Sequence, residues 1–264
     1  MNDEVKILIN KVVKNILMKM GSQETIKKLD DKHTKKIHFI PKSYRIFGGI
    51  LQSMNIQLGN FIEELMSLLI ENEEEYEIVA EYSGKKSSAF VLSNNNESRI
   101  DNYISKCQLE PEGYCITEFP KLQQSILEDT DIKQNTFKHD IDLLFKNKTT
   151  GTYYYLEIKY NDDHDTGKFV DINRKFIKTY AYLVKELGIT DRNGLVPILF
   201  FFNNKKMKNN PYIPESTNIR RGERFFSEFL SNINYDDLNN YMTSLSESNE
   251  TKKMFDNLYD KVIK

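Results

Sequence analysis

The segment YYYLEIKYND, residues 153–162, places a glutamate and a lysine inside an otherwise apolar and aromatic run. Side chains of a β-strand alternate between its two faces, so Glu157 and Lys159 leave this strand on the same face. The aliphatic side chains of Leu156 and Ile158 leave on the other face, toward a core. A strand that is otherwise apolar therefore carries a carboxylate and an ammonium group side by side, and the surrounding sequence must explain why.

A second strand-like segment, HDIDLLF, precedes it at residues 139–145, and the turn-forming run KNKTTG lies between the two. We expect the two segments to pair as an antiparallel hairpin. A turn centred near Thr149 then places Asp142 nearly opposite Glu157. Two carboxylates and a lysine are therefore predicted to meet on one patch of the sheet.

Such a patch suits the hydrolysis of phosphodiesters. Two carboxylates and the carbonyl oxygen of Ile158 can hold a hard divalent cation such as Mg²⁺, which keeps water at its remaining positions. The cation polarises a phosphoryl oxygen, and Lys159 can orient or deprotonate the attacking water and offset charge on the phosphate. The alternative is a cross-strand ion pair on an exposed sheet face, which contributes only ~0.2–1 kcal/mol.

The Glu-x-Lys pattern alone is weakly diagnostic, because it occurs three times, beginning at Glu4, Glu157 and Glu250. The first copy lies in a helical pattern and the last in a polar tail. Only the middle copy follows a second strand that carries an aspartate on a compatible face. The middle copy is therefore the candidate site.

The combination HDIDLLF…YYYLEIKYND resembles the PD-(D/E)xK motif of nucleases. Three flanking segments are similar to those of type II restriction endonucleases: NDDHDTGK before a long basic helix, RRGERFFSEFL late in the chain, and the early helix LGNFIEELMSLL. Over residues 45–230 the sequence resembles the HinfI-like family, which cuts DNA at G-A-N-T-C. The resemblance implies an α/β (α+β) fold with a mixed central β-sheet flanked by helices, and extra helices at both ends.

The resemblance also implies roles for individual residues, with Mg²⁺ as the cofactor. Asp142 and Glu157 would be the carboxylate ligands of the metal, and the carbonyl oxygen of Ile158 would be a third ligand. Lys159 would be the water-positioning base. Glu63, or alternatively Glu64, would support the metal through a water. No proline precedes the first aspartate, because HDID stands there, and this departure leaves Asp140 as an alternative to Asp142. We favour Asp142, which lies deeper in the apolar run and opposite Glu157.

Basic residues after the motif are candidates for contact with DNA, since phosphate contacts dominate DNA affinity. One group forms a single stripe together with Lys185 along the predicted long helix that follows the loop NDDHDTG, where the alternative is an ordinary solvated face. A second group stands at an expected helix start and a third in a polar loop. The candidates are Lys168, Lys175, Lys178, Arg220, Arg221, Arg224, Lys205 and Lys206. The loop DDHD, residues 162–165, is interpreted as a solvated turn rather than a second metal site.

The remaining segments give a coarse secondary structure. We expect a turn-rich region over 22–45, a loop or helix junction over 47–59, and a strand pair formed by 75–84 with 88–94. Helices are expected over 4–20, over 60–72 with Asn60 as its cap, over 97–109, and over 169–187 with Gly188 ending it. Residues 195–203 are nearly all apolar and are predicted to form a central strand buried on both faces.

Length and composition limit the classes of protein. The 264 residues suit a single endonuclease domain over 1–264, with a catalytic core at about 57–231, an N-terminal helical arm over 1–56 and C-terminal helices over 232–264. The net charge of −2 excludes a uniformly basic surface but not a local basic cleft. Two cysteines in no metal-binding pattern are expected to be reduced and buried. The N-terminus matches neither a signal peptide nor a membrane span, so we expect a cytoplasmic protein without membrane contact.

These observations favour a Mg²⁺-dependent type II restriction endonuclease that makes sequence-specific double-strand cuts in DNA. We expect a homodimer, because one centre cuts one strand and a two-fold pair cuts both. One alternative is a DNA repair or junction nuclease of the same superfamily, which would recognise structure rather than sequence. The other is a non-catalytic DNA-binding protein in which the Glu–Lys pair is structural.

Overall fold

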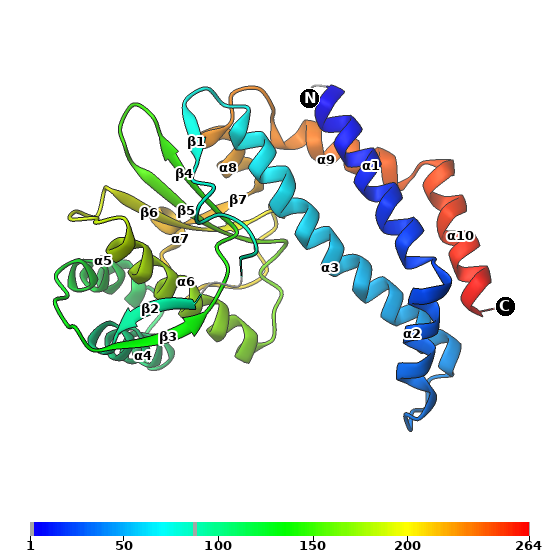
Figure 1. Ribbon diagram of the computed structural model, residues 1–264, viewed down its shortest axis with the longest axis horizontal. Coiled ribbons are helices and arrows are strands. Elements are labelled where there is room, and N and C mark those ends of the chain that lie inside the picture. The colour runs from blue at the N-terminus through cyan, green and yellow to red at the C-terminus, as the bar shows by residue number, and fades with distance from the viewer. Residues whose placement is uncertain (1–2, 87–88, 264) are drawn as a thin grey trace. The chain divides into compact units, whose positions relative to one another are not determined.

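The computed structural model describes residues 3–86 and 89–263. The chain divides into two compact units (Figure 1). The helical unit comprises Met1–Leu65 and Ser231–Lys264, and the sheet unit comprises Met66–Leu230. The terminal segments that the sequence predicted as helical extensions, 1–56 and 232–264, both belong to the helical unit. The predicted catalytic patch belongs to the sheet unit.

The helical unit packs amphipathic helices around a small apolar core. Its helices are α1 (Asp3–Met20), α2 (Gln23–Thr34), the first part of α3 (Lys42–Glu71), α9 (Tyr235–Ser246) and α10 (Asn249–Ile263). The core side chains come from four of these helices and are Leu17, Met20, Leu29, Ile46, Ile50, Met54 and Leu258. The predicted helix over 4–20 is confirmed.

The predicted turn-rich region and loop in this unit are wrong, because residues 23–34 and 42–71 are helical. Ser22 caps α2 by accepting a hydrogen bond from the backbone N–H of Thr25, and Leu29 is the buried residue of that helix. Gly49 lies inside α3, where a Cβ atom would stand 3.1 Å from Cδ2 of Leu29. Glycine therefore serves close helix contact here rather than a loop, and Asn60 is an interior residue of α3 rather than its cap.

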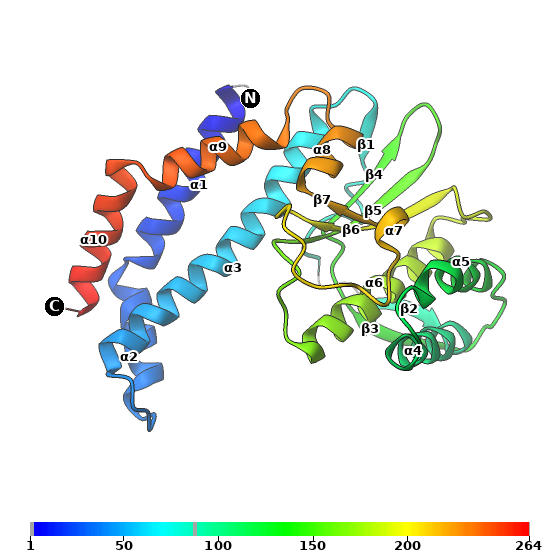
Figure 2. The same cartoon turned by 180° about the vertical axis from the view of Figure 1, so that it is seen from behind.

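The sheet unit contains a five-stranded mixed sheet in the order β1-β4-β5-β6-β7 (Figure 2). Its strands are β1 (Tyr76–Ile78), β4 (Leu143–Asn147), β5 (Tyr153–Lys159), β6 (Leu195–Phe201) and β7 (Ile219–Arg221). The pairs β1–β4 and β4–β5 are antiparallel, and β5–β6 and β6–β7 are parallel. The predicted fold class, a mixed central sheet with flanking helices, is confirmed.

Two further strands, β2 (Ala89–Ser93) and β3 (Gln134–Lys138), form a separate antiparallel ribbon. The predicted pairing of 75–84 with 88–94 is wrong, because β1 pairs with β4 and β2 pairs with β3. An alternating pattern identifies a strand but does not name its partner. The predicted link between those two segments includes residues 87–88, which lie outside the described residues.

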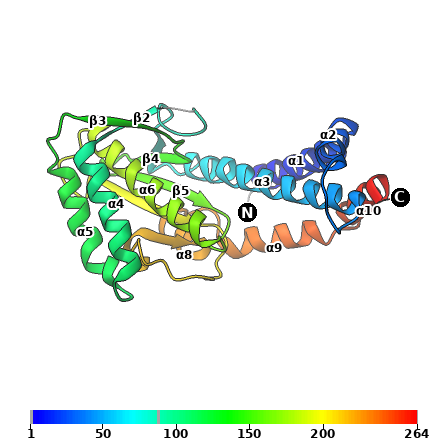
Figure 3. The same ribbon diagram turned by 90° about the horizontal axis from the view of Figure 1, so that it is seen from below.

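Helices cover both faces of the five-stranded sheet. One face carries α6 (Thr166–Glu186), and α4 (Asn94–Leu109) and α5 (Tyr114–Leu127) pack against α6 and against each other (Figure 3). The other face carries α8 (Gly222–Phe229), where Phe229 packs against Phe145 and Tyr154 with ring centroids 5.6 and 5.1 Å apart. The short α7 (Glu215–Asn218) precedes β7. The buried strand predicted at 195–203 is confirmed, and Gly188, at φ +62°, follows the last turn of α6.

The hairpin of β4 and β5 has the register that the sequence predicted. Leu143 pairs with Leu156, so the next step of the ladder aligns Asp142 with Glu157. In the turn, the side chain of Asn147 accepts hydrogen bonds from the N–H groups of Thr149 and Thr150. The first strand is shorter than predicted, because β4 begins at Leu143 and Asp142 precedes it.

No helix within residues 3–86 and 89–263 is long and apolar enough to cross a membrane.

Both cysteines are free and buried, as predicted. Burial raises the pKa of Cys107 to about 11 and also raises the pKa of Cys115. We therefore expect neither thiol to react with Ellman's reagent at pH 8 while the protein is folded, because the reactive thiolate is scarce and inaccessible. Both thiols should react once guanidinium unfolds the chain. Rapid labelling of either thiol in the native protein would contradict their burial.

Candidate active site

Three charged side chains meet where β5 ends. Glu157 and Lys159 lie on β5 and leave it on the face covered by α6, and Asp142 approaches from the residue before β4. Oδ2 of Asp142 accepts a hydrogen bond from the N–H of Ile158 at 2.7 Å, so this carboxylate is tied directly to the backbone of β5. The structure thus brings together the three residues that the hairpin argument placed on one patch.

The ammonium group of Lys159 lies among three oxygens. Nζ is 2.8 Å from Oε1 of Glu157, 2.8 Å from the carbonyl oxygen of Ile158 and 3.3 Å from Oδ2 of Asp142. The side chains of Glu157, Asp142 and Lys159 are only 4%, 13% and 23% exposed. These low exposed fractions exclude the alternative of an ion pair on an exposed sheet face. We call this arrangement of three oxygens the oxygen cradle.

The second oxygen of Glu157 is held by two residues that the sequence analysis did not select. The hydroxyl of Tyr155 donates a hydrogen bond to Oε2 at 2.8 Å, and Nε2 of His139 lies 3.3 Å from the same atom. Tyr155 could have been found by alternation, since it stands two residues before Glu157 on the same face. His139 comes directly after β3, a strand that was not predicted. Together these contacts fix the orientation of the Glu157 carboxylate.

The electrostatics of the cradle keep both partners charged. Burial alone would raise the pKa of Glu157, but Lys159 and His139 outweigh burial and lower that pKa to about 2. Burial alone would lower the pKa of Lys159, but the carboxylates of Glu157 and Asp142 raise it above its ordinary value. At neutral pH the cradle therefore holds a protonated Lys159 beside the ionised carboxylate of Glu157.

The two candidate aspartates of HDID occupy different environments. Oδ1 of Asp140 accepts a hydrogen bond from the N–H of Lys86 at 3.0 Å, which connects it to the segment after β1. Asp142 instead contacts Ile158 and Lys159. The cradle therefore contains Asp142 rather than Asp140.

The two candidate glutamates, Glu63 and Glu64, lie on α3 within the part of that helix that belongs to the helical unit. Their support of a metal stays a prediction.

Several basic residues predicted to contact DNA are engaged in ion pairs within the protein. Lys178 lies 2.6 Å from Glu97, and Lys175 lies 3.0 Å from Asp171. Arg220 is buried and makes two contacts with Glu228 through Nε and Nη2. The expected helix start at Arg220 and Arg221 is wrong, because both belong to β7 and α8 begins at Gly222. The exposed members of the predicted set are Lys168, Lys205, Lys206 and Arg224.

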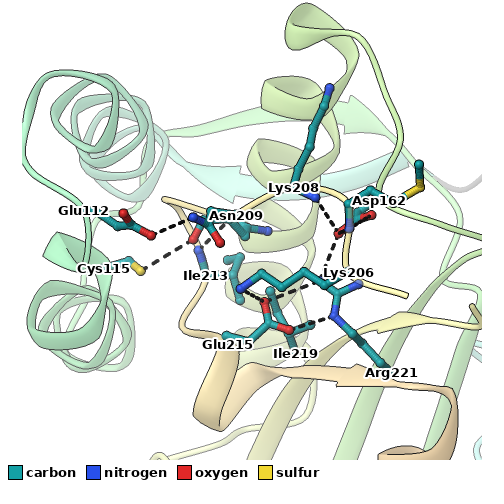
Figure 4. Close-up of polar contacts among 12 residues, drawn as sticks. Glu112, Cys115, Asp162, Lys206, Lys208, Asn209, Ile213, Glu215, Ile219 and Arg221 are labelled. Atoms are coloured by element: carbon teal, nitrogen blue, oxygen red, sulfur yellow. Dashed lines mark hydrogen bonds and ion pairs between the residues drawn. The ribbon is translucent and has the colours of Figure 1, made fainter. Parts of the chain in front are cut away.

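Asp162, three residues beyond β5, anchors the long loop that follows β6 (Figure 4). Its carboxylate is 1% exposed and accepts hydrogen bonds from the N–H groups of Met207 at 3.0 Å and Lys208 at 3.2 Å. Nη2 of Arg221 donates to it at 2.9 Å. The interpretation of this stretch as a solvated turn is therefore wrong at Asp162. No local pattern reveals this role, because its partners lie 45 to 59 residues away.

Glu215 extends the same network on the far side of Arg221. It accepts a hydrogen bond from Nε of Arg221 at 2.8 Å and lies 3.4 Å from Nζ of Lys206 (Figure 4). Lys159, Phe201 and Arg221 stand in register at the carboxyl ends of three parallel strands. The cradle and the anchored loop therefore share one edge of the sheet, the edge at which α/β proteins bind their ligands.

A mixed sheet with Asp, Glu-x-Lys and a backbone carbonyl gathered at a hairpin defines the chain as a restriction-endonuclease-like nuclease. Comparison with known proteins specifies the family. The family described as "Type II restriction endonuclease, HinfI" matches residues 1–246. The type II restriction enzyme HinfI of Haemophilus influenzae is 59% identical over 263 residues, covering 100% of this chain and 99% of that enzyme. No solved structure matches the chain significantly.

The chain belongs to the HinfI family of type II restriction endonucleases and is a site-specific deoxyribonuclease. The predicted family, fold and class of enzyme are thereby confirmed.

The anchor at Asp162 makes a testable contribution to stability. Replacing Asp162 by Ala leaves Arg221 without its most buried partner and frees two backbone N–H groups, which should cost about 3–5 kcal/mol of unfolding free energy. Asp163 is exposed, so Asp163→Ala is the matched control and should change stability by less than about 0.5 kcal/mol. Denaturant unfolding followed by circular dichroism measures both. Equal stability of the two variants would contradict the anchor.

Proposed function

We propose that this enzyme hydrolyses phosphodiester bonds of double-stranded DNA with Mg²⁺ held in the oxygen cradle. The observation that carries the proposal is the position of the Lys159 ammonium, which is surrounded by Asp142, Glu157 and the carbonyl of Ile158. A cation already occupies the place where a hard divalent metal would find three oxygen ligands. Enzymes of this class generally use a divalent metal, which agrees with this arrangement.

The donor set fits Mg²⁺ better than a transition metal. Among residues 3–86 and 89–263, no group of three or more His, Cys, Asp and Glu side chains is arranged to hold a metal. Two carboxylates and one carbonyl suit Mg²⁺, which is bound by few protein oxygens and keeps several waters. When bound, the ion supplies polarisation of the phosphoryl oxygen and a water of lowered pKa.

The residues of the chain then have distinct tasks. Asp142, Glu157 and the Ile158 carbonyl would hold the ion, and Lys159, which contacts the same three oxygens, would then turn toward the substrate. From there its ammonium group can position the attacking water and stabilise the charge that develops on the phosphate. Tyr155 and His139 contact Oε2 of Glu157 and would keep this carboxylate oriented when Lys159 no longer contacts its Oε1.

The exposed basic residues along the same sheet unit are the proposed DNA contacts. Lys168, Lys205, Lys206 and Arg224 are exposed and can reach phosphates or base edges. The other predicted residues, Lys175, Lys178, Arg220 and Arg221, contribute by holding the surface in place through their ion pairs. The anchored loop over 202–214 is the proposed reader of base edges. We propose G-A-N-T-C as the site and a two-fold homodimer as the assembly, because both strands are cut.

The decisive experiment is the digestion of a sequenced plasmid. We expect discrete fragments that require Mg²⁺, disappear in EDTA and end at G-A-N-T-C. Asp142→Asn and Lys159→Ala should each lower kcat by about 10²–10³ or more, because each removes charge stabilisation in the transition state. Lys253→Ala, an exposed change on α10 outside the predicted DNA set, is the control.

Other outcomes of the digestion separate the alternatives. Cleavage without fixed ends, favouring branched or damaged DNA, would replace the restriction activity with a structure-specific one. An intact plasmid with a folded wild-type protein would leave only the DNA-binding alternative.

The competition between Lys159 and the metal gives a second prediction. Lys159→Met removes the competing cation and leaves two carboxylates facing each other, so Mg²⁺ should bind this variant more tightly than the wild type. Mg²⁺ should then raise its melting temperature more, since ligand at 100 times Kd stabilises a protein by about 2.7 kcal/mol. Lys168→Met, an exposed change on α6, should respond to Mg²⁺ as the wild type does. An equal Mg²⁺-induced rise in melting temperature in the two variants would show that the metal binds outside the cradle.

A further inference from the structure

The connection between α2 and α3 exposes apolar side chains to an unusual degree. Ile37 is 104% exposed and Phe39 is 93% exposed, and Ile40 is exposed beside them. Residues 34–42 are all exposed. We call this segment, 32–45 with the adjoining helix ends, the helical tip. Clustered apolar groups rimmed by polar residues mark interaction sites on soluble proteins.

The rim of the helical tip is cationic. It contains five basic residues, Lys32, Lys35, Lys36, Lys42 and Arg45, and two acidic residues adjoin it on α2. Lys42 pairs with Asp30 at 2.8 Å. In the part of the chain that the structure describes, the side chains of Lys32, Lys35 and Lys36 have no carboxylate partner within ion-pair distance. Desolvation together with the charges of Lys36, Arg45 and Lys32 lowers the pKa of His33, as expected in a positive field.

Local contacts give the helical tip a defined conformation. Nδ1 of His38 accepts a hydrogen bond from the N–H of Ile40 at 2.9 Å, and the rings of His38 and Phe39 stack at 5.1 Å. Nη1 of Arg45 donates to the carbonyl oxygen of Lys36. At the base, Gly49 lets α2 and α3 pack closely through Leu29. The apolar side chains are therefore presented to solvent by a folded hairpin of helices.

We infer that the helical tip is a second DNA-contacting element of the enzyme, with its lysines against phosphates and Phe39 against bases. A cationic rim selects a polyanion, and proteins that deform DNA insert apolar side chains between base pairs beside basic residues. A second copy of the chain fits less well, because two such tips would repel each other. The inference rests on the proposed DNA substrate and adds a contact that takes no part in the hydrolysis.

The absence of tryptophan from the chain allows a direct test. Phe39→Trp makes the helical tip the sole source of tryptophan emission. We expect added duplex DNA containing the recognition site, in EDTA so that no cleavage occurs, to quench or blue-shift that emission. Ile7→Trp, on α1 and 66% exposed, is the control and should keep its emission. Equal responses of both proteins, or none in Phe39→Trp while DNA binds, would overturn the inference.

The lysines are tested through the salt dependence of binding. In fluorescence anisotropy, the slope of log K against log salt should fall by about 0.9 for each lost phosphate contact, hence by about 1.8 in Lys35→Gln/Lys36→Gln. Lys253→Gln/Lys261→Gln, exposed on α10, should leave the slope unchanged. An unchanged slope in the tip variant would overturn the inference. The inference would also be overturned if the emission of Phe39→Trp changed with protein concentration in the absence of DNA, because that change would indicate self-association through the helical tip.

Plasmid cleavage by the wild-type protein separates this inference from the proposed function. If the wild type cuts and the tip variants bind DNA normally, the inference fails and the proposed function stands. If the wild type neither binds nor cuts DNA, both fail.

Discussion

The sheet unit depends on how a buried ammonium group is compensated. An isolated charge in a protein interior costs several kcal/mol, and this cost is offset only where several oppositely polarised atoms surround it in good geometry. Lys159 meets that condition with two carboxylates and one carbonyl, all supplied by the hairpin of β4 and β5. The pairing of β4 with β5 therefore also brings together the oxygens that hold the Lys159 ammonium group. A slip of one residue between β4 and β5 would turn Glu157 and Lys159 together to the opposite face and would separate both from Asp142.

The surrounding structure protects this hairpin from both sides. Apolar packing under α6 covers the face that carries the charges, and Tyr155, itself buried there, supplies the hydroxyl that holds Glu157. Parallel pairing with β6 adds a neighbour whose carboxyl end lies at the same edge. Beyond that edge Asp162 and Arg221 form a second buried ion pair. The unit therefore combines an apolar interior with two charged clusters, each held together by several hydrogen bonds.

Local sequence patterns predicted that the three side chains of the cradle meet, because all three belong to one hairpin. Asp142, Glu157 and Lys159 lie within one hairpin, and alternation together with a turn determines their approach. The patterns failed where the answer depends on distant partners. Alternation in β1 and β2 could not reveal their partners, and the charged sequence of α2 hid a helix whose apolar side is narrow. The ion pair of Asp162 and Arg221 spans 59 residues, so only the folded chain shows that both are buried rather than solvated.

The anchor at Asp162 has a consequence for how specificity can change over evolutionary time. Met207 and Lys208 offer it only their main-chain N–H groups, so this attachment does not depend on which side chains those positions carry, proline excepted. Lys205 and Met207 are exposed. The loop is thus fastened by its backbone while exposed side chains remain open to substitution. On the proposal that this loop reads base edges, point changes in it would alter base preference while the cradle keeps its geometry.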